Sequence, residues 1–257
     1  MSKEAIKEFF DKTAASYYAE RYAQAKDLCS HEMITRKIAV FSLLDKYQLK
    51  DGKLLDAGCG SAVMVNEYLE RGFEVCGIDI SAEMIKEAKK NAASNKARFW
   101  VGDVEKMDLP SEIFDVVVSI GVLDYLKDDK AVLAEFLRVL KPGGAAVLSV
   151  SNVFSPVHII RTMVAPLAKI FSRHRANEKV FCASFTTRAH NPWEFDKTLA
   201  NCGLKKIEAK FIGSSFMPFN VKLPRFYFSM LKIFNGIFSK IPFGSGYVVL
   251  VKKKANG

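Results

Sequence analysis

The chain lacks the features that mark membrane-spanning, secreted and metal-binding proteins. No stretch of 18 apolar residues occurs in its 257 residues, so no membrane-spanning helix is expected. The first residues, MSKEAIKEFFDK, are too charged for a secretory signal. The five cysteines form no CxxC pair and show no metal-ligand spacing, so we predict neither a disulfide framework nor a metal site. Scattered cysteines are typical of a reducing, cytoplasmic compartment.

Acidic residues are scarce in the last 105 residues. Residues 153–257 hold 4 acidic residues against 17 basic ones, whereas residues 1–152 hold 24 against 21. The C-terminal stretch also holds 13 of the 20 phenylalanines and three of the four histidines. A uniformly basic nucleic-acid-binding protein would not show this division. We therefore predict a near-neutral core followed by a basic, aromatic region.

What the chain does contain is a regular alternation of short apolar strands and amphipathic helices. Apolar residues recur at helical spacing over residues 3–48. The strands predicted next are 53–57, 73–80, 98–102, 114–120 and 145–150, and the helices between them are 64–70, 82–92 and 129–140. The last of these helices should stop in a turn at Lys141–Gly144. This order is typical of a parallel sheet covered on both faces, which binds ligands at the carboxyl ends of its strands.

The clearest sign of a ligand is the segment LLDAGCGSA at residues 54–62. Gly58 and Gly60 carry no Cβ, so the backbone can turn sharply there and approach a ligand. No Gly-Lys-Ser/Thr follows, which excludes a phosphate-binding P-loop. Val63 stands where a dinucleotide fingerprint requires a third glycine. The loop therefore favours a ligand that needs no phosphate cradle.

Aspartates follow or end three successive predicted strands. Asp56 precedes the glycine loop and is placed to hold a cationic amine. Asp79, 19 residues after Gly60, is placed to accept hydrogen bonds from a ribose diol. Asp103 can accept a hydrogen bond from an exocyclic amine, with Val104 beside an adenine ring. Each aspartate alone could be a turn former, but the ordered set suits a nucleoside with an amino-acid tail.

Five segments in unbroken order resemble the successive motifs of class I S-adenosylmethionine-dependent methyltransferases. Within residues 50–152 they are LLDAGCGSA, EVCGIDIS, GDVEKMDLP, FDVVVSIGVLDYL and LKPGG. The resemblance implies an α/β, Rossmann-like fold whose seven-stranded, mostly parallel sheet has an antiparallel last strand. It also implies S-adenosyl-L-methionine as the cofactor and S-adenosyl-L-homocysteine as the product.

Pattern and resemblance together predict a set of cofactor-binding positions on these motifs. In chain order they are Asp56, Gly58, Gly60, Asp79, Ile80, Asp103, Val104, Ile120 and Gly121. The segment FFDKTAASYYAERY resembles the first helices of small-molecule members, which fold over the cofactor. A tyrosine there, Tyr17 or Tyr22, would contact the cofactor's carboxylate, although either could be a packing aromatic. The chain departs from the family at Ala62, usually a third glycine, and at Asp124-Tyr125, often Glu-His.

The fourth predicted strand is followed by Ser119–Val122 and not by an Asn/Asp-Pro-Pro-Tyr/Phe loop. That loop is typical of amino methylation of nucleic-acid bases and of glutamine, so these acceptors are disfavoured. A hydroxyl acceptor needs a base, for which His158, His190 and Asp124 are the candidates. An amine or carboxylate acceptor needs none.

A helix at 193–201 and strands at 205–212 and 247–253 complete the predicted sheet. The whole chain, 1–257, is thus predicted to be one domain. Its parts are an N-terminal helical cap at 1–50, a cofactor-binding core at 51–152, cap insertions at 153–190 and 213–245, and the end of the core at 191–212 and 246–257. The cap sequence resembles methyltransferases of quinone, tetrapyrrole and glycolipid pathways without choosing among them.

Three interpretations of the basic insertions remain open. They could form a lid whose cations face solvent, a pocket for an anionic acceptor, or a surface over 222–240 that meets an anionic membrane on its inner face. A nucleic-acid partner is disfavoured because the aromatic residues follow helical spacing. The favoured function is O-methylation of a small or lipid-like acceptor. The alternatives are N-methylation of a small amine and a non-catalytic, membrane-associated protein that binds S-adenosylmethionine.

Overall fold

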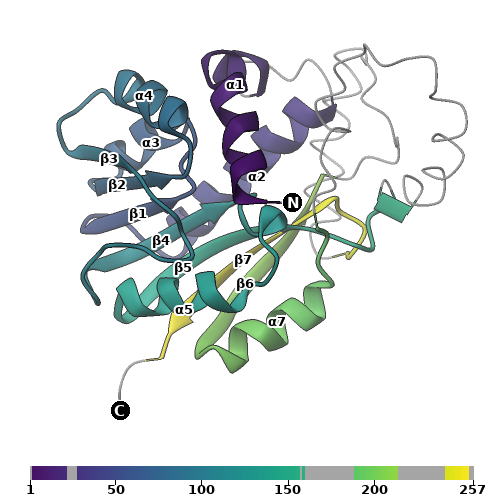
Figure 1. Ribbon diagram of the computed structural model, residues 1–257. Helices are drawn as coiled ribbons and strands as arrows, with labels where there is room; N and C mark the ends of the chain where they lie inside the picture. Colours follow the sequence, from purple (N-terminus) through teal and green to yellow (C-terminus); the bar gives the residue numbers. More distant parts are fainter. Residues whose placement is uncertain (1, 22–27, 157, 160–187, 214–240, 255–257) are drawn as a thin grey trace, which may run out of the picture.

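Seven strands form one twisted sheet in the order β3-β2-β1-β4-β5-β7-β6 (Figure 1). The computed structural model describes residues 2–21, 28–156, 158–159, 188–213 and 241–254, without the side chains of 17–21 and 28–29. The strands are β1 (Lys53–Ala57), β2 (Glu74–Asp79), β3 (Ala97–Val101), β4 (Phe114–Ile120), β5 (Leu140–Ser151), β6 (Leu204–Ile212) and β7 (Gly246–Lys253). The helices are α1 (Lys3–Arg21), α2 (Leu28–Lys46), α3 (Val65–Glu70), α4 (Ala82–Asn91), η1 (Leu123–Tyr125, a 3-10 turn), α5 (Lys130–Val139) and α7 (Pro192–Asn201).

The strands from β1 to β5 pair in parallel, whereas β7 runs antiparallel to both of its neighbours, β5 and β6. The predicted Rossmann-like sheet with an antiparallel last strand is therefore confirmed. The chain moves outward from β1 to β3 and then returns to place β4 on the other side of β1. This reversal lies at the carboxyl ends of β1 and β4, the position at which such folds bind ligands.

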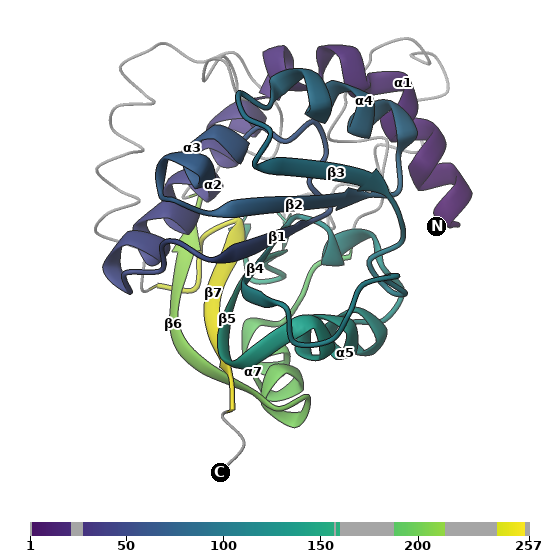
Figure 2. The same cartoon turned by 90° about the vertical axis from the view of Figure 1, so that its left-hand side faces the viewer.

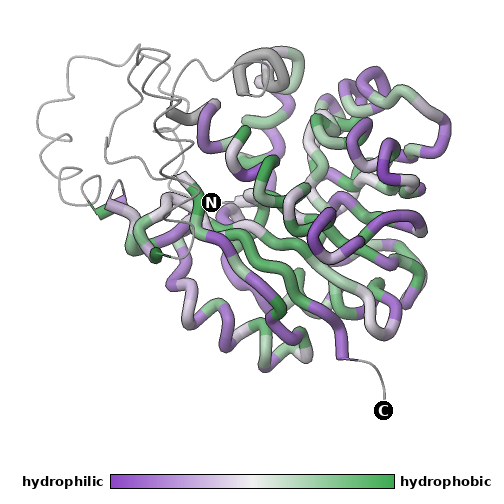
Figure 3. The backbone as a smooth tube through the Cα atoms, turned by 180° about the vertical axis from the view of Figure 1, so that it is seen from behind, coloured by the Kyte–Doolittle hydropathy of each residue, from purple (hydrophilic) through white to green (hydrophobic). Residues whose placement is uncertain are grey.

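The two faces of the sheet bury different helices because successive strand side chains point to opposite sides. Leu54 packs in the cluster that includes the buried faces of α2, α3 and α4. The next residue, Leu55, packs in the cluster that includes α5 and α7. Figure 2 shows the two helical layers on either side of the sheet. Figure 3 shows the hydrophobic residues concentrated along the central strands.

The predicted element bounds agree closely with the structure except at the start of β5. The strands at 53–57 and 114–120 have the predicted bounds, and Ser81 caps α4 by accepting from the Met84 amide. Lys141–Gly144 was predicted to be a turn between elements, but β5 already begins at Leu140. The pairing jumps from Phe114↔Leu140 to Val116↔Ala145, so these residues form a bulge inside the strand.

Most of the two predicted cap insertions lies outside the described residues. Residues 160–187 and 214–240 lie outside the described residues, so the assignment of 153–190 and 213–245 to a cap stays a prediction. None of the described helices has both the length and the apolar character needed to cross a membrane.

Candidate cofactor and acceptor site

The glycine loop after β1 adopts a backbone that requires glycine at one position in particular. Gly58 has φ +79°, and a Cβ placed on it would lie 2.2 Å from Cγ2 of Val122, which follows β4. The amides of Gly58 and Cys59 both donate to the carbonyl of Ile78 at the end of β2. The loop is thereby held across the carboxyl ends of three strands. Ala62, where the family has glycine, also takes a positive φ of 55°.

Asp79 holds this loop in place from the end of β2. Its Oδ2 accepts from the Gly60 amide at 2.9 Å and its Oδ1 accepts from the Ser81 amide at 2.9 Å. Burial raises the pKa of Asp79, while these two amides oppose the rise. Each carboxylate oxygen retains a second lone pair, so the group could still accept hydrogen bonds from a diol.

Asp56 is buried at the end of β1, with 4% of its surface exposed. No donor from the described residues reaches its carboxyl group. Burial, and next the nearby charge of Asp79, raise the pKa of Asp56 from 3.8 to about 7. A buried carboxylate without a donor is costly, and a cation placed beside it would lower that cost.

The predicted adenine-binding residues lie just beyond β3. Asp103 accepts from the Glu105 amide through Oδ1, and its Oδ2 lies 2.5 Å from the ammonium of Lys3 on α1. Lys3 also pairs with Glu105. Val104 is buried, so it can pack against a ring but is not free to move far.

Two predicted positions follow β4 at the sheet's switch point. Ile120 is half-buried at the end of β4, and Gly121 takes φ +69° directly after it. A Cβ on Gly121 would lie 3.2 Å from Nη1 of Arg36, so the guanidinium from α2 packs against this backbone.

Helix α1 lies along the edge where these residues meet (Figures 1 and 2). Besides the Lys3 contacts, Asp11 accepts from the Ser81 hydroxyl at 2.6 Å, and Phe10 packs edge-on against Tyr125, with ring centroids 5.5 Å apart. Asp11 and Lys3 were not predicted, because nothing local marks a contact across 70 or 100 residues of chain. The side chain of Tyr17 and all of Tyr22 lie outside the described part of the chain.

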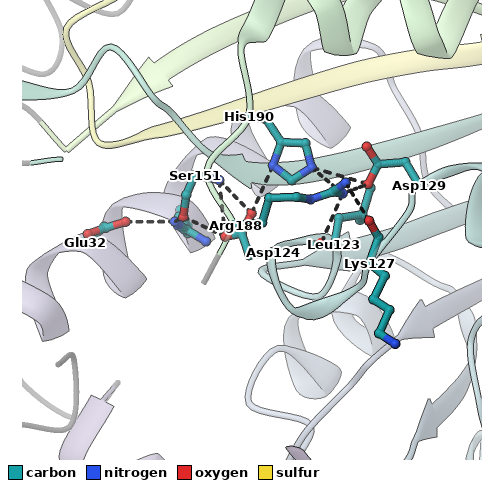
Figure 4. Close-up of polar contacts among 9 residues, drawn as sticks. Glu32, Leu123, Asp124, Lys127, Asp129, Ser151, Arg188 and His190 are labelled. Atoms are coloured by element: carbon teal, nitrogen blue, oxygen red, sulfur yellow. Dashed lines mark hydrogen bonds and ion pairs between the residues drawn. The ribbon is translucent and has the colours of Figure 1, made fainter. Parts of the chain in front are cut away.

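A buried cluster of charged residues lies just beyond the carboxyl ends of β4 and β5 (Figure 4). It brings together two of the predicted base candidates, Asp124 and His190. Nδ1 of His190 lies 3.4 Å from Oδ1 of Asp124. The cluster also contains residues that were not predicted, namely Glu32, Arg36, Asp129, Ser151 and Arg188.

The pKa values of Asp124 and His190 shift in opposite directions. Burial alone would raise the pKa of Asp124, but His190, Arg36 and Ser151 hold it below its ordinary value. Burial alone would lower the pKa of His190, but Asp124 and Asp129 raise it above its ordinary value. Asp124 is therefore an ionised partner of weak basicity, and His190 directs both ring nitrogens toward protein side chains.

The third base candidate, His158, follows β5 and is not among the residues of this cluster. It is half-buried on the short helical stretch after Ser155, a buried residue just beyond β5. Among the described residues, no group of three or more histidine, cysteine or acidic side chains could hold a metal ion.

Comparison with known proteins agrees with the geometry of the site. Residues 55–148 match the family model described as Methyltransferase domain. The malonyl-[acyl-carrier protein] O-methyltransferase of Serratia marcescens is 35% identical over 97 residues, which are 38% of this chain and 37% of that protein. A ubiquinone biosynthesis O-methyltransferase of Bradyrhizobium sp. is 35% identical over 102 residues, which are 39% and 40% of the two chains. The matches thus span about two fifths of these relatives.

A solved structure extends the likeness to nearly the whole chain at the level of the fold. The magnesium protoporphyrin IX methyltransferase of Synechocystis PCC 6803, with bound S-adenosylhomocysteine, superposes with a TM-score of 0.68 at 15% identity. The superposition covers 98% of this chain and 100% of that chain. Residues 55–148 therefore carry a methyltransferase domain, and the sheet order and glycine loop of the chain agree with a Rossmann-like methyltransferase fold.

Proposed function

We propose that this chain is an S-adenosylmethionine-dependent methyltransferase that methylates an oxygen atom of a small or lipid-like acceptor. The observation that carries the proposal is the ordered set of Asp56, Asp79 and Asp103 around a glycine loop at the sheet's switch point. A nucleoside with a cationic amino-acid tail matches each of these carboxylates, and phosphate matches none.

The predicted cofactor-binding residues have distinct tasks in this proposal. Gly58 and Gly60 admit the methionine part, and Asp56 faces its ammonium group. Asp79, with Ile80, receives the ribose hydroxyls, and Asp103 with Val104 receives the adenine. Ile120 and Gly121 form the floor. When bound, the cofactor supplies an electrophilic methyl group on a sulfonium, and the protein's contribution is alignment and exclusion of water.

Asp103 has a competitor for the adenine amine. Lys3 pairs with Oδ2 of Asp103, so adenine must either bind to this carboxylate together with Lys3 or break the ion pair. Because the Lys3 side chain is 44% exposed, the pair is screened and yields at little cost.

The two curated relatives are both named O-methyltransferases, which favours oxygen over nitrogen as the methylated atom. One name specifies malonyl-[acyl-carrier protein] as the acceptor, and the other specifies a step of ubiquinone biosynthesis. A malonyl carboxylate is ionised at neutral pH and needs no base, whereas a hydroxyl would need one. For a hydroxyl acceptor, His158, His190 and Asp124 are the candidate bases, of which Asp124 and His190 lie 3.4 Å apart.

Titration calorimetry followed by a product screen tests the function. S-adenosylhomocysteine should bind, and transfer of labelled methyl groups should be detected with malonyl thioesters or hydroxylated quinones as acceptors. Failure of the wild-type protein to bind the cofactor product would overturn the proposal. Transfer to small amines alone would favour the N-methyltransferase, and binding without any product would favour a non-catalytic protein.

We also propose a cytoplasmic location, with peripheral contact between residues 222–240 and an anionic membrane as a testable addition. These residues lie outside the described part, so the proposal is based on their sequence of aromatic and basic positions. The full chain should float with anionic liposomes and lose flotation on combined Arg225→Glu and Lys232→Glu substitution. Flotation that is unchanged by these substitutions would contradict the contact.

A further inference from the structure

The Nε2 atom of His190 has two neighbours that demand opposite protonation states. It lies 2.8 Å from Nη2 of Arg188 and 3.3 Å from Oδ1 of Asp129. A guanidinium can only donate, so its contact requires a bare Nε2. A carboxylate can only accept, so its contact requires a protonated Nε2. The two contacts therefore belong to the neutral and the charged ring respectively.

The other ring nitrogen, Nδ1, lies 3.4 Å from Oδ1 of Asp124, an ion-pair distance without hydrogen-bond geometry. Asp124 faces Nδ1, and its carboxylate is fixed by the amide of Ser151 at 2.9 Å and by the Ser151 hydroxyl at 2.6 Å. Phe195 packs edge-on against the ring, with centroids 5.3 Å apart. Protonation of His190 therefore changes the partner of Nε2 and leaves the ring's other contacts in place.

Charge balance favours the charged ring while the cluster is closed. Among the described residues, Arg36 and Arg188 supply two positive charges, and Glu32, Asp124 and Asp129 supply three negative ones. A neutral ring would leave one unbalanced negative charge in a largely buried cluster, whereas an imidazolium balances it. In the described part of the chain, a further titratable neighbour is the thiol of Cys202, which interacts with Asp129 and whose pKa is raised chiefly by burial.

Residues 188–190, here called the 188–190 strap, are also held by backbone hydrogen bonds. The His190 amide donates to the Ser151 carbonyl at 2.8 Å, and the Val153 amide donates to the His190 carbonyl at 3.0 Å. The Arg188 amide donates to the Asp124 carbonyl at 2.8 Å. These bonds tie residues 188–190 to the η1 turn that follows β4 and to the end of β5.

We propose that His190 is a positioning residue, which as an imidazolium bridges Asp124 and Asp129 and thereby holds the 188–190 strap against the acceptor side of the site. Loss of its proton leaves Nε2 as an acceptor for Arg188, which keeps its own ion pair with Asp129, so the strap loses the direct contact between the ring and Asp129 and is held less firmly. The consequence for the acceptor rests on the proposed function, whereas the bridge itself does not.

Nuclear magnetic resonance of the imidazole nitrogens in the full chain tests the bridge without an acceptor. Asp129→Asn removes an anion and should lower the pKa of His190 by about 1. Arg188→Gln removes the donor to the bare nitrogen and should raise it. Asp128→Asn is the matched control, because Asp128 is exposed and accepts from the Lys130 amide, and it should change nothing. Shifts of the same sign in the first two variants would overturn the proposal.

Hydrogen exchange then tests the strap. The amides of Val153, Arg188 and His190 should lose protection as pH rises through the pKa of His190, after correction for intrinsic rates. In His190→Gln their protection should no longer depend on pH. Unchanged pH dependence in this variant would contradict the positioning role. Should His190→Gln fail to fold, the opposite shifts predicted for Asp129→Asn and Arg188→Gln still decide the matter.

S-adenosylhomocysteine binding separates this inference from the proposed function. His190→Gln should bind it as the wild type does at every pH, because the contacts of the ring with described residues are to Arg188, Asp129, Asp124 and Phe195 and not to the predicted cofactor-binding residues. Loss of cofactor binding by the wild type would count against the proposed function alone, and weakened binding confined to His190→Gln would count against a role on the acceptor side.

Discussion

At the scale of single residues, the carboxyl groups around the glycine loop differ in how they are satisfied. Asp79 accepts hydrogen bonds from two backbone amides, whereas Asp56 is buried without a donor from the described residues. The unsatisfied group is the one that a positively charged ligand would stabilise most. Binding and stability therefore place opposite demands on Asp56.

Asp56→Asn should weaken cofactor binding and stabilise the protein at high pH. The pKa of Asp56 is about 7 in the folded chain and near 3.8 in the unfolded chain. Between pH 3.8 and pH 7 the folded state therefore binds more protons than the unfolded state does. Stability is consequently lost as pH rises from about 4 to about 7, by up to about 4 kcal/mol above pH 7. Thermal unfolding at pH 8 should show a higher midpoint for Asp56→Asn, and a lower midpoint would contradict this account.

The same carboxyl group predicts proton release on binding. An ammonium group favours the ionised form, so the affinity for S-adenosylhomocysteine should rise between pH 6 and pH 8. Calorimetry in buffers of different ionisation enthalpy should detect protons released at pH 6.5 by the wild type and none by Asp56→Asn. Equal release from both proteins would assign the proton to another group.

At the scale of elements, the glycine loop and α1 both contact the carboxyl-end region of the strands but are held there by different kinds of contact. The loop is held by strand ends, since its amides donate to Ile78 and Asp79 accepts from it. Helix α1 is held by side chains at Ser81, Asp103 and Tyr125. The contacts of the loop therefore depend on its backbone conformation, whereas each contact of α1 can be removed by a single side-chain substitution.

Gly58→Ala should lower the free energy of unfolding by more than the positive φ at this position alone would cause. An alanine at φ +79° costs about 1–2 kcal/mol, and the close approach to Val122 adds about 1–3 kcal/mol of overpacking. Gly143→Ala is the control, because Gly143 has φ +75° but no atom within 4 Å of its Cβ position. Denaturant unfolding should show a larger loss for Gly58→Ala, and equal losses would refute the contact with Val122.

Asp11→Ala should loosen α1 from the start of α4. The substitution removes the acceptor of the Ser81 hydroxyl, a bond of about 0.5–1.5 kcal/mol or somewhat more for a charged acceptor. S-adenosylhomocysteine should then dissociate faster, which stopped-flow displacement can measure. Lys12→Ala, which breaks an exposed pair with Glu8 on the same helix, should leave the rate unchanged. Equal rates in wild type and Asp11→Ala would mean that α1 does not retain the ligand.

At the scale of the whole molecule, the last strand is inserted into the sheet and is not appended to it. β7 lies between β5 and β6, and Val248, Val249, Leu250 and Val251 are fully buried. A chain that stops after Gly244 should therefore lose cooperative unfolding, whereas a chain that stops after Lys254 should keep it. Circular dichroism during thermal unfolding distinguishes these outcomes, and a cooperative transition in the shorter chain would contradict the structural role of β7.

Much of the core could be predicted from the sequence because its signals are local. β1 and β4 have the predicted bounds, since each is an apolar run with clear stops on both sides. The start of β5 could not be predicted, because Lys141-Pro142-Gly143-Gly144 is locally a turn and only pairing with β4 draws Leu140 into the strand. Local composition does not reveal that pairing.

The sequence by itself determined the order of strands and helices, the glycine loop and the aspartates that follow the strands. These features depend on neighbouring residues and on a periodicity that one segment carries alone. Only the tertiary structure decided that His190 lies between Asp124 and Asp129, and that Arg36 packs beside Gly121. Such contacts join residues separated by 60 or more positions, and burial shifts the pKa of a group only once the chain has folded around it.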